Sequence, residues 1–184
     1  MYLPTKEECL NLLNQHEVPD HVQAHSCCVA LIASTIAQEL SKKGFPINKD
    51  LVLAASLLHD IAKIKCLNSK EDHCEQGAKI VSKLGYPEIG DIIRQHVKLD
   101  KICMTTNLPA MITNYADKRV KHTQIVTLQE RFDDIKNRYV KNANDLKRIE
   151  NLFQQTKAVE KRIFDAMGAD PNFILTLNCK NEHH

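Results

Sequence analysis

The sequence predicts an all-α fold, a single-domain helical bundle. Apolar residues recur at helical spacing along the chain, and the alternation typical of strands is almost absent. A chain of 184 residues with 43% hydrophobic residues can bury one good core but is too short to be expected to bury two. We therefore expect one domain over residues 1–184, with a core at about 19–120, C-terminal helices at about 127–168 and a tail at 169–184.

Capping and stop signals give the order of the helices. A helix begins where a side chain can accept a hydrogen bond from first-turn amides or where proline fits the first turn, and it commonly ends at glycine. In chain order, these signals are the capping box of Thr5 and Glu8, Pro19, Gly44, Asn48, Gly85, Pro87, the capping box of Thr127 and Glu130, and Gly168.

Most of these predicted helices carry a histidine or an aspartate beside apolar residues. The second runs through His25, and the third carries His59-Asp60 in its last turn. The fourth extends from about His73 to Leu84, the fifth holds His96, and a helix after residues 105–107 carries Asp117. The charged helix that starts at the second capping box is predicted to present a solvated face over 131–139.

Composition narrows the class of protein. A formal net charge of +2 does not indicate a polymeric nucleic acid or a membrane surface as partner. No apolar run approaches the roughly 18 residues of a spanning helix, and the N-terminus lacks the pattern of a secretory signal. The seven cysteines form no Cys-x-x-Cys pair, so reduced thiols in a cytoplasmic protein are expected. The terminal His183-His184 resembles the end of a purification tag and is left out of the metal argument.

The pair His59-Asp60 follows the apolar stretch 51–58, where the pattern demands burial. Buried ionisable groups are costly unless they are paired or coordinate a metal. Imidazole and carboxylate donors without thiolate suit iron or manganese best, with zinc, cobalt or nickel also suitable. The candidate ligands are far apart in sequence and can converge only through folding: His25, His59, Asp60, His73, His96 and Asp117.

The ordered motifs resemble the HD-domain phosphohydrolase superfamily. They are His25-Ser26, Leu57-Leu58-His59-Asp60-Ile61-Ala62-Lys63 and Ile112-Thr113-Asn114-Tyr115-Ala116-Asp117. The resemblance implies that His25, His59, Asp60 and Asp117 bind one divalent metal. The segments beginning at His73 and ending at His96 are similar to the extra histidine motifs of binuclear members, which implies a second metal and a bridging role for Asp60.

This resemblance implies a phosphohydrolase in which hydroxide generated at the metal attacks a phosphomonoester or phosphoanhydride of a nucleotide-like metabolite. Asp60 and Lys63 would be catalytic, and Lys63, Lys118 and Arg119 would bind substrate phosphate. A lysine near a helix C-terminus also has a helix-dipole explanation, so Lys63 keeps that alternative. A metal-binding module that senses a nucleotide without turnover is the second functional hypothesis. A homodimer is compatible with either.

At several positions the sequence differs from the motifs of particular branches of the superfamily, and these differences argue against the activities of those branches. Lys63-Ile64 stands where ppGpp hydrolases have Glu-Asp, and where the mononuclear 5′-nucleotidases have a glutamate this chain has Lys63. The segment 85–87 reads as a turn between helices rather than as the signature of cyclic-di-GMP phosphodiesterases. The likeness is closest to small bacterial binuclear hydrolases, including those that cleave diadenosine tetraphosphate symmetrically, although His96-Val97 replaces their histidine-threonine pair.

Overall fold

The computed structural model describes residues 2–67, 69 and 71–179, and within them the chain is almost entirely helical. The elements are α1 (Lys6–Gln15), α2 (Asp20–Lys42), α3 (Lys49–Leu58), α4 (Lys63–Cys66), α5 (His73–Lys83), α6 (Pro87–Arg94), α7 (Leu108–Asp117), β1 (Val120–Lys121), β2 (Gln124–Ile125), α8 (Leu128–Tyr139), α9 (Ala143–Met167) and the 3-10 helix η1 (Pro171–Thr176). The predicted all-α class is confirmed.

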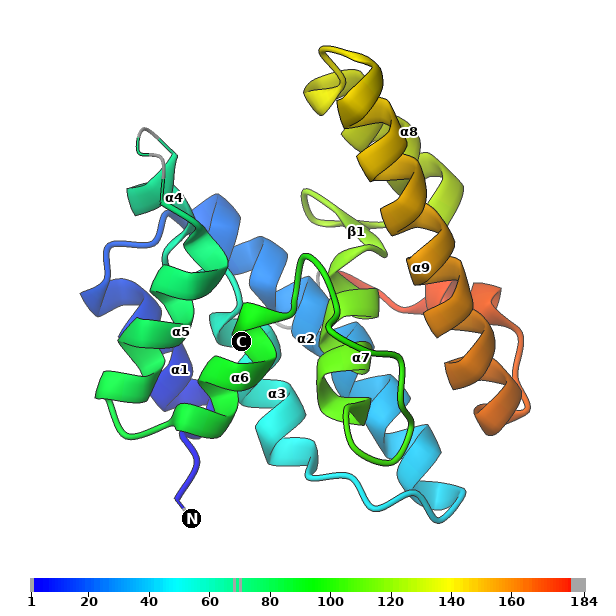
Figure 1. The fold of residues 1–184 in the computed structure, drawn as a ribbon. Helices are drawn as coiled ribbons and strands as arrows, with labels where there is room; N and C mark the ends of the chain where they lie inside the picture. Colours follow the sequence, from blue (N-terminus) through cyan, green and yellow to red (C-terminus); the bar gives the residue numbers. More distant parts are fainter. Residues whose placement is uncertain (1, 68, 70, 180–184) are drawn as a thin grey trace.

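The long helix α2 organises the bundle. It packs against α3, α7 and α9, while α5 and α6 form a tight pair beside α3. The helices α8 and α9 form an antiparallel hairpin that rises on the other side of the molecule (Figure 1). One continuous apolar core joins the two sides, from Leu13 through Ile36 and Tyr115 to Phe164. The structure is therefore a single helical body. No helix among the described residues is long and apolar enough to cross a membrane.

The local helix signals are confirmed at the residues that carry them. Thr5 and Glu8 form a complete capping box, and so do Thr127 and Glu130. The Asn48 side chain caps α3 by accepting from the amide of Leu51. At the other end of the chain, α9 stops at Gly168, which adopts the left-handed conformation that favours glycine.

The prediction that His59-Asp60 lies in the last turn of a helix is wrong in detail. Helix α3 ends at Leu58, and the chain then turns tightly, with the amide of Ile61 bonded to Leu58 O at 3.0 Å. Successive side chains on a helix point about 100° apart. The turn instead brings His59 Nε2 within 3.3 Å of Asp60 Oδ2. The sequence patterns also did not predict α4, the β1–β2 pair, or η1, which lies in the expected tail.

The pair α5 and α6 approaches unusually closely because of Gly90. A Cβ atom at Gly90 would lie 2.6 Å from the Ser82 hydroxyl and 3.0 Å from the carbonyl of Ala78. Helix α6 ends at Arg94, so His96 lies in the turn beyond it rather than on the helix. The glycine thus lets α6 pack closely on the second half of α5, whose first residue is His73.

Candidate metal centre

The fold brings all six predicted metal ligands together. Each comes from the end of a helix or the turn beyond it, except His25, which lies in the second turn of α2. Five of the six side chains are buried, and the sixth, His73, is half-buried. The residues are His25 of α2, His59 and Asp60 of the turn after α3, His73 of α5, His96 of the turn after α6, and Asp117 of α7.

The first half-site consists of His25, His59 and Asp117 with Oδ2 of Asp60. His25 Nε2 lies 3.2 Å from Asp117 Oδ1, and His59 Nε2 lies 3.7 Å from the same oxygen. His59 Nε2 also lies 3.3 Å from Asp60 Oδ2. Two imidazole nitrogens and two carboxylate oxygens from three separate parts of the chain therefore face one point.

The second half-site consists of His73 and His96 with Oδ1 of Asp60. This oxygen lies 3.7 Å from His73 Nε2 and 3.5 Å from His96 Nε2, and the two nitrogens are 3.2 Å apart. Cys74 Sγ is 3.8 Å from His73 Nε2, a neighbour that sequence patterns did not indicate. Burial raises the pKa of the Cys74 thiol to about 12, so it stays protonated.

Backbone carbonyls orient three of the histidine rings. The Nδ1–H of His25 donates to the carbonyl of His122 at 2.8 Å, and that of His59 donates to the carbonyl of Ser56 at 2.8 Å. The Nδ1–H of His96 donates to the carbonyl of Ile93 at 2.7 Å. Such bonds fix the tautomer of metal-binding histidines and leave Nε2 as the ligand atom. All three Nε2 atoms here point into the cluster.

Two buried polar atoms of the cluster lack a hydrogen-bond partner. They are His59 Nε2 and Asp60 Oδ1, one in each half-site. A buried nitrogen or oxygen without a partner is costly and needs an explanation. Both are good ligands for a divalent cation, so the residues present fit the metal that the sequence predicts.

The electrostatics of the cluster keep its carboxylates charged. Burial alone would raise the pKa of Asp60, but His59 and its neighbours hold it well below the usual value. The pKa of Asp117 is likewise low despite burial, chiefly because of Lys118. Burial and the adjacent His96 lower the pKa of His73 to about 4, which leaves its ring neutral. Ionised carboxylates and a neutral imidazole are the forms that bind metals. Burial would lower the pKa of His59, but Asp60 and Asp117 raise it to about 10, so this ring must give up a proton to bind a metal.

The structure brings two of the three predicted phosphate ligands to the cluster. Lys63 Nζ lies 2.6 Å from Asp60 Oδ2, and its side chain is 38% exposed, so it can reach a ligand. Burial would lower the Lys63 pKa, but the Asp60 charge raises it overall. Lys118 Nζ donates to Asp117 Oδ2 at 2.7 Å and to the carbonyl of His96 at 3.0 Å.

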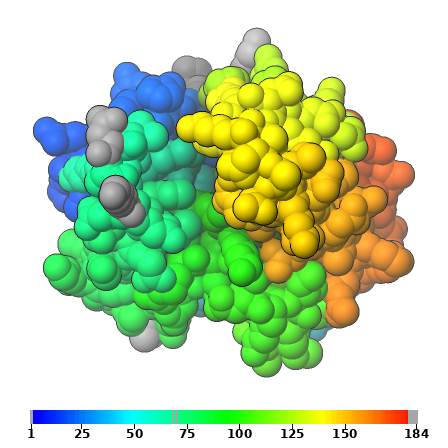
Figure 2. Space-filling view, turned by 45° about the horizontal axis from the view of Figure 1, so that its top comes forward, coloured from blue at the N-terminus to red at the C-terminus, as the bar shows by residue number. Residues whose placement is uncertain are grey.

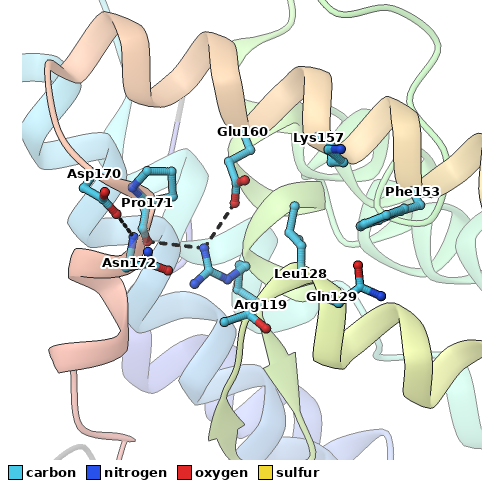
Figure 3. Close-up of a pocket in the computed structure, with 10 residues that line it drawn as sticks. Arg119, Leu128, Gln129, Phe153, Lys157, Glu160, Asp170, Pro171 and Asn172 are labelled. Carbon is cyan, nitrogen blue, oxygen red and sulfur yellow. Dashed lines mark hydrogen bonds and ion pairs between the residues drawn. The ribbon is translucent and has the colours of Figure 1, made fainter.

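Arg119 is not brought to this cluster. Its side chain points toward α9 and the chain after it, where Nη1 lies 3.3 Å from Glu160 Oε2 and 3.3 Å from the carbonyl of Pro171 (Figure 3). Nη1 also donates to the hydroxyl of Tyr115, and Nε donates to the carbonyl of Val126 at 2.7 Å. It lines a separate cavity of about 330 Å³. The contacts of Arg119 therefore join α7 to α9.

A cavity of about 390 Å³ opens from the cluster toward α8 and α9. In the space-filling view the surface is hollowed between the teal segment that includes α4 and the yellow end of the α8–α9 hairpin (Figure 2). On the hairpin side it is lined by residues that the sequence had placed on a solvated helix face: Arg131, Phe132, Ile135 and Tyr139. That prediction is corrected, because one face of α8 looks into the cavity.

The model of the HD domain family matches residues 22–121, more than half of the chain and all six clustered residues. The chain belongs to the HD domain family. The match ends before α8, so the α8–α9 hairpin that lines the cavity lies beyond the matched residues. Membership of this family places the chain among metal-dependent phosphohydrolases at the level of the superfamily.

One curated relative is a protein of Picrophilus torridus named tRNA (cytidine(56)-2′-O)-methyltransferase. The two are 27% identical over a match that covers 92% of this chain and 51% of that protein. The chain therefore spans about half the length of this relative. No solved structure matches the chain.

Proposed function

We propose that this HD domain hydrolyses a phosphomonoester or phosphoanhydride bond of a nucleotide-like metabolite, with two divalent metals. The orientation of Asp60 carries the proposal. One carboxylate oxygen faces His59 and the other faces the pair His73 and His96, as a ligand shared by two ions would. The nitrogen and oxygen donor set favours iron or manganese.

Metals bound at such a pair of sites lower the pKa of water and polarise a phosphoryl oxygen. The protein's own part is to hold the reacting phosphate beside the cluster. Lys63 lies at the mouth of the cluster, where its charge can offset that of a phosphate oxygen. Lys118 neutralises Asp117 and, by donating to the carbonyl of His96, ties the two half-sites together.

The cavity also supports a nucleotide-like substrate. Lys63 and Lys118 at its base and Arg131 on its wall provide positive charge, and arginine suits bidentate contact with phosphate. Phe132 and Tyr139 provide apolar and aromatic surface near these cations. Ligand pockets that combine apolar walls with a few placed polar groups bind small molecules with specificity.

Turnover by the metal-loaded protein tests this proposal. Protein reconstituted with Mn²⁺ or Fe²⁺ is assayed for phosphate release from a panel of nucleotides and other phosphorylated metabolites. We expect metal-dependent release from at least one nucleotide, and loss of that release in Asp60→Asn. Tight nucleotide binding without any turnover would instead support the second hypothesis, a sensing module of the same fold.

We propose no methyl transfer for this chain, although a relative is named as a tRNA methyltransferase. The match covers only half of that protein, and the cluster described above consists of side chains that could hold a metal. We further propose that the protein works in the reducing cytoplasm, because Cys9, Cys66, Cys74 and Cys103 are free thiols.

A further inference from the structure

A second cavity of about 540 Å³ adjoins the cavity of the metal centre. The two share Val97, Arg148 and Leu152 among their lining residues, so they lie side by side along α9. The second cavity also contains Lys98, which follows the turn of His96, and Lys147 of α9. Together these neighbouring cavities, which we call the trough, are lined by the candidate metal ligands and by three cations, Lys98, Lys147 and Arg148.

The charge of this trough is one-sided. No acidic side chain is among the described residues that line the second cavity, while amide side chains such as Asn144 line it together with the cations. The side chains of Lys98, Lys147 and Arg148 are exposed. A cleft lined by one sign of charge concentrates the field and attracts ligands of opposite charge.

The cavity of the metal centre would also be lined mainly by positive charge once metals occupy the cluster. Asp60 and Asp117 would then be ligands, which leaves Glu71 as the other acidic residue among its described lining residues. Glu71 already accepts a hydrogen bond from Gln76 at 3.0 Å. On the opposite wall, Arg131 donates through Nη1 to Asp134, but its buried Nε has no partner. A buried donor of this kind is satisfied by an acceptor entering the cavity.

We propose that Lys98, Lys147 and Arg148 form a remote phosphate subsite, and that the substrate is a small molecule with a chain of several phosphates, such as a nucleoside polyphosphate. The phosphate that is cleaved lies at the metal centre, and the rest of the chain runs past Arg148 toward Lys98. Water attacks the terminal phosphorus, the anhydride P–O bond breaks, and the shortened chain leaves with the bridging oxygen and the electron pair of that bond. The water oxygen stays on the released orthophosphate, and the proton that it loses passes to solvent.

This inference rests on the proposed function and narrows it. A monoester has one phosphate, which Lys63 and the metal centre can hold without help from the second cavity. A polymeric nucleic acid would need cations spread along the surface, whereas the net charge of the whole chain is only +2. Several of its cations instead line the trough beside the proposed site of cleavage.

Substrate selectivity tests the subsite. We would measure kcat/KM of the metal-loaded protein for a nucleoside triphosphate and for the matching monophosphate, in Arg148→Ala and in Lys98→Ala/Lys147→Ala. We expect the ratio of the two values to fall at least about tenfold, through a higher KM, which corresponds to about 1.4 kcal/mol. Lys161→Ala is the matched control, because Lys161 is an exposed lysine of α9 that pairs with Asp165. An unchanged ratio in the trough variants would overturn the proposal.

Equilibrium binding separates failure of the subsite from failure of the enzyme. Titration calorimetry with inorganic tripolyphosphate and with orthophosphate needs no turnover. We expect the trough variants to weaken tripolyphosphate binding by about tenfold or more relative to Lys161→Ala, with little effect on orthophosphate. If no substrate is hydrolysed but this difference is seen, the proposed function fails and the subsite stands. If a 5′-phosphorylated oligonucleotide binds more tightly than tripolyphosphate through the same lysines, a nucleic acid is the ligand and the proposal is wrong.

Discussion

Replacing Asp60 by asparagine is the most informative perturbation of the metal centre. The two side chains have nearly the same shape, so the packing of this buried position is preserved. Asparagine, however, has one neutral oxygen and one NH₂ group in place of two charged oxygens. Because Oδ2 faces the first half-site and Oδ1 faces the second, the NH₂ group must replace the ligand atom of one of them.

The expected magnitude follows from that geometry. One half-site loses its shared ligand entirely, and the other keeps a weaker, uncharged one. Even residues that only support metal ligands typically cost about 10–100-fold in affinity or activity. We therefore expect Asp60→Asn to retain at most one metal per chain and to lose at least about 1,000-fold in kcat/KM, or about 4 kcal/mol of transition-state stabilisation.

Elemental analysis and steady-state kinetics on untagged protein measure both effects. His73→Ala should be milder, because it removes a ligand from the second half-site alone. His21→Ala is the control, since this histidine is exposed at the start of α2. Circular dichroism of the metal-free proteins would show that the variants fold. An Asp60→Asn protein with wild-type metal content and turnover would refute the bridging role, and with it the argument from carboxylate orientation.

Four further predictions follow from the same structure. The double variant His73→Ala/His96→Ala should lose about one equivalent of metal per chain while the first half-site stays occupied, as measured by elemental analysis. An unchanged metal content would mean that the two histidines only line the cavity. Stripping the metal with a chelator should lower Tm by about 5–10 °C, since a ligand at one hundred times its Kd adds about 2.7 kcal/mol; an unchanged melting curve would argue against a bound ion. Arg119→Met should lower the free energy of unfolding in urea by about 1.5–3 kcal/mol, because the hydrogen bonds to Tyr115, Val126, Glu160 and Pro171 are lost, and it should leave KM unchanged. A variant of unchanged stability with a raised KM would instead support the phosphate-binding role predicted from the sequence. Gly90→Ala should destabilise by about 1–3 kcal/mol, because the added methyl overlaps the backbone of α5; equal stability in thermal melts would contradict that packing.

Local signals in the sequence were enough to predict the longer helices, but not the short α4 and η1. The capping residues act within three or four positions of themselves, so Thr5 with Glu8 and Thr127 with Glu130 specify helix starts whatever the tertiary structure. The turn after Leu58 could not be predicted in this way. It depends on the convergence of His59 and Asp60 on residues from distant helices, which no local pattern encodes.

The six clustered residues could be predicted because buried histidines and aspartates are costly and their motifs resemble a known family. The directions of neighbouring side chains could not. Lys118 and Arg119 are adjacent at the end of α7, yet one points into the metal centre and the other packs against α9. The position of Arg131 and Tyr139 on the cavity wall could not be predicted either. Polar and charged residues are expected both on a solvated helix face and on a cationic cavity wall, so composition does not separate the two.

The proposed ligands of the two half-sites come from different parts of the fold. Ligands of the first come from α2, the turn after α3 and α7, which also build the apolar core. The second adds only His73 and His96, both from the hairpin of α5 and α6, to the shared Asp60. In the proposed two-metal centre, substitutions at these two positions alone would remove the second ion and leave the helices that hold the first one unchanged. The choice between one metal and two would thus depend on the α5–α6 hairpin alone, which could be altered in evolution or by design while the rest of the centre is kept.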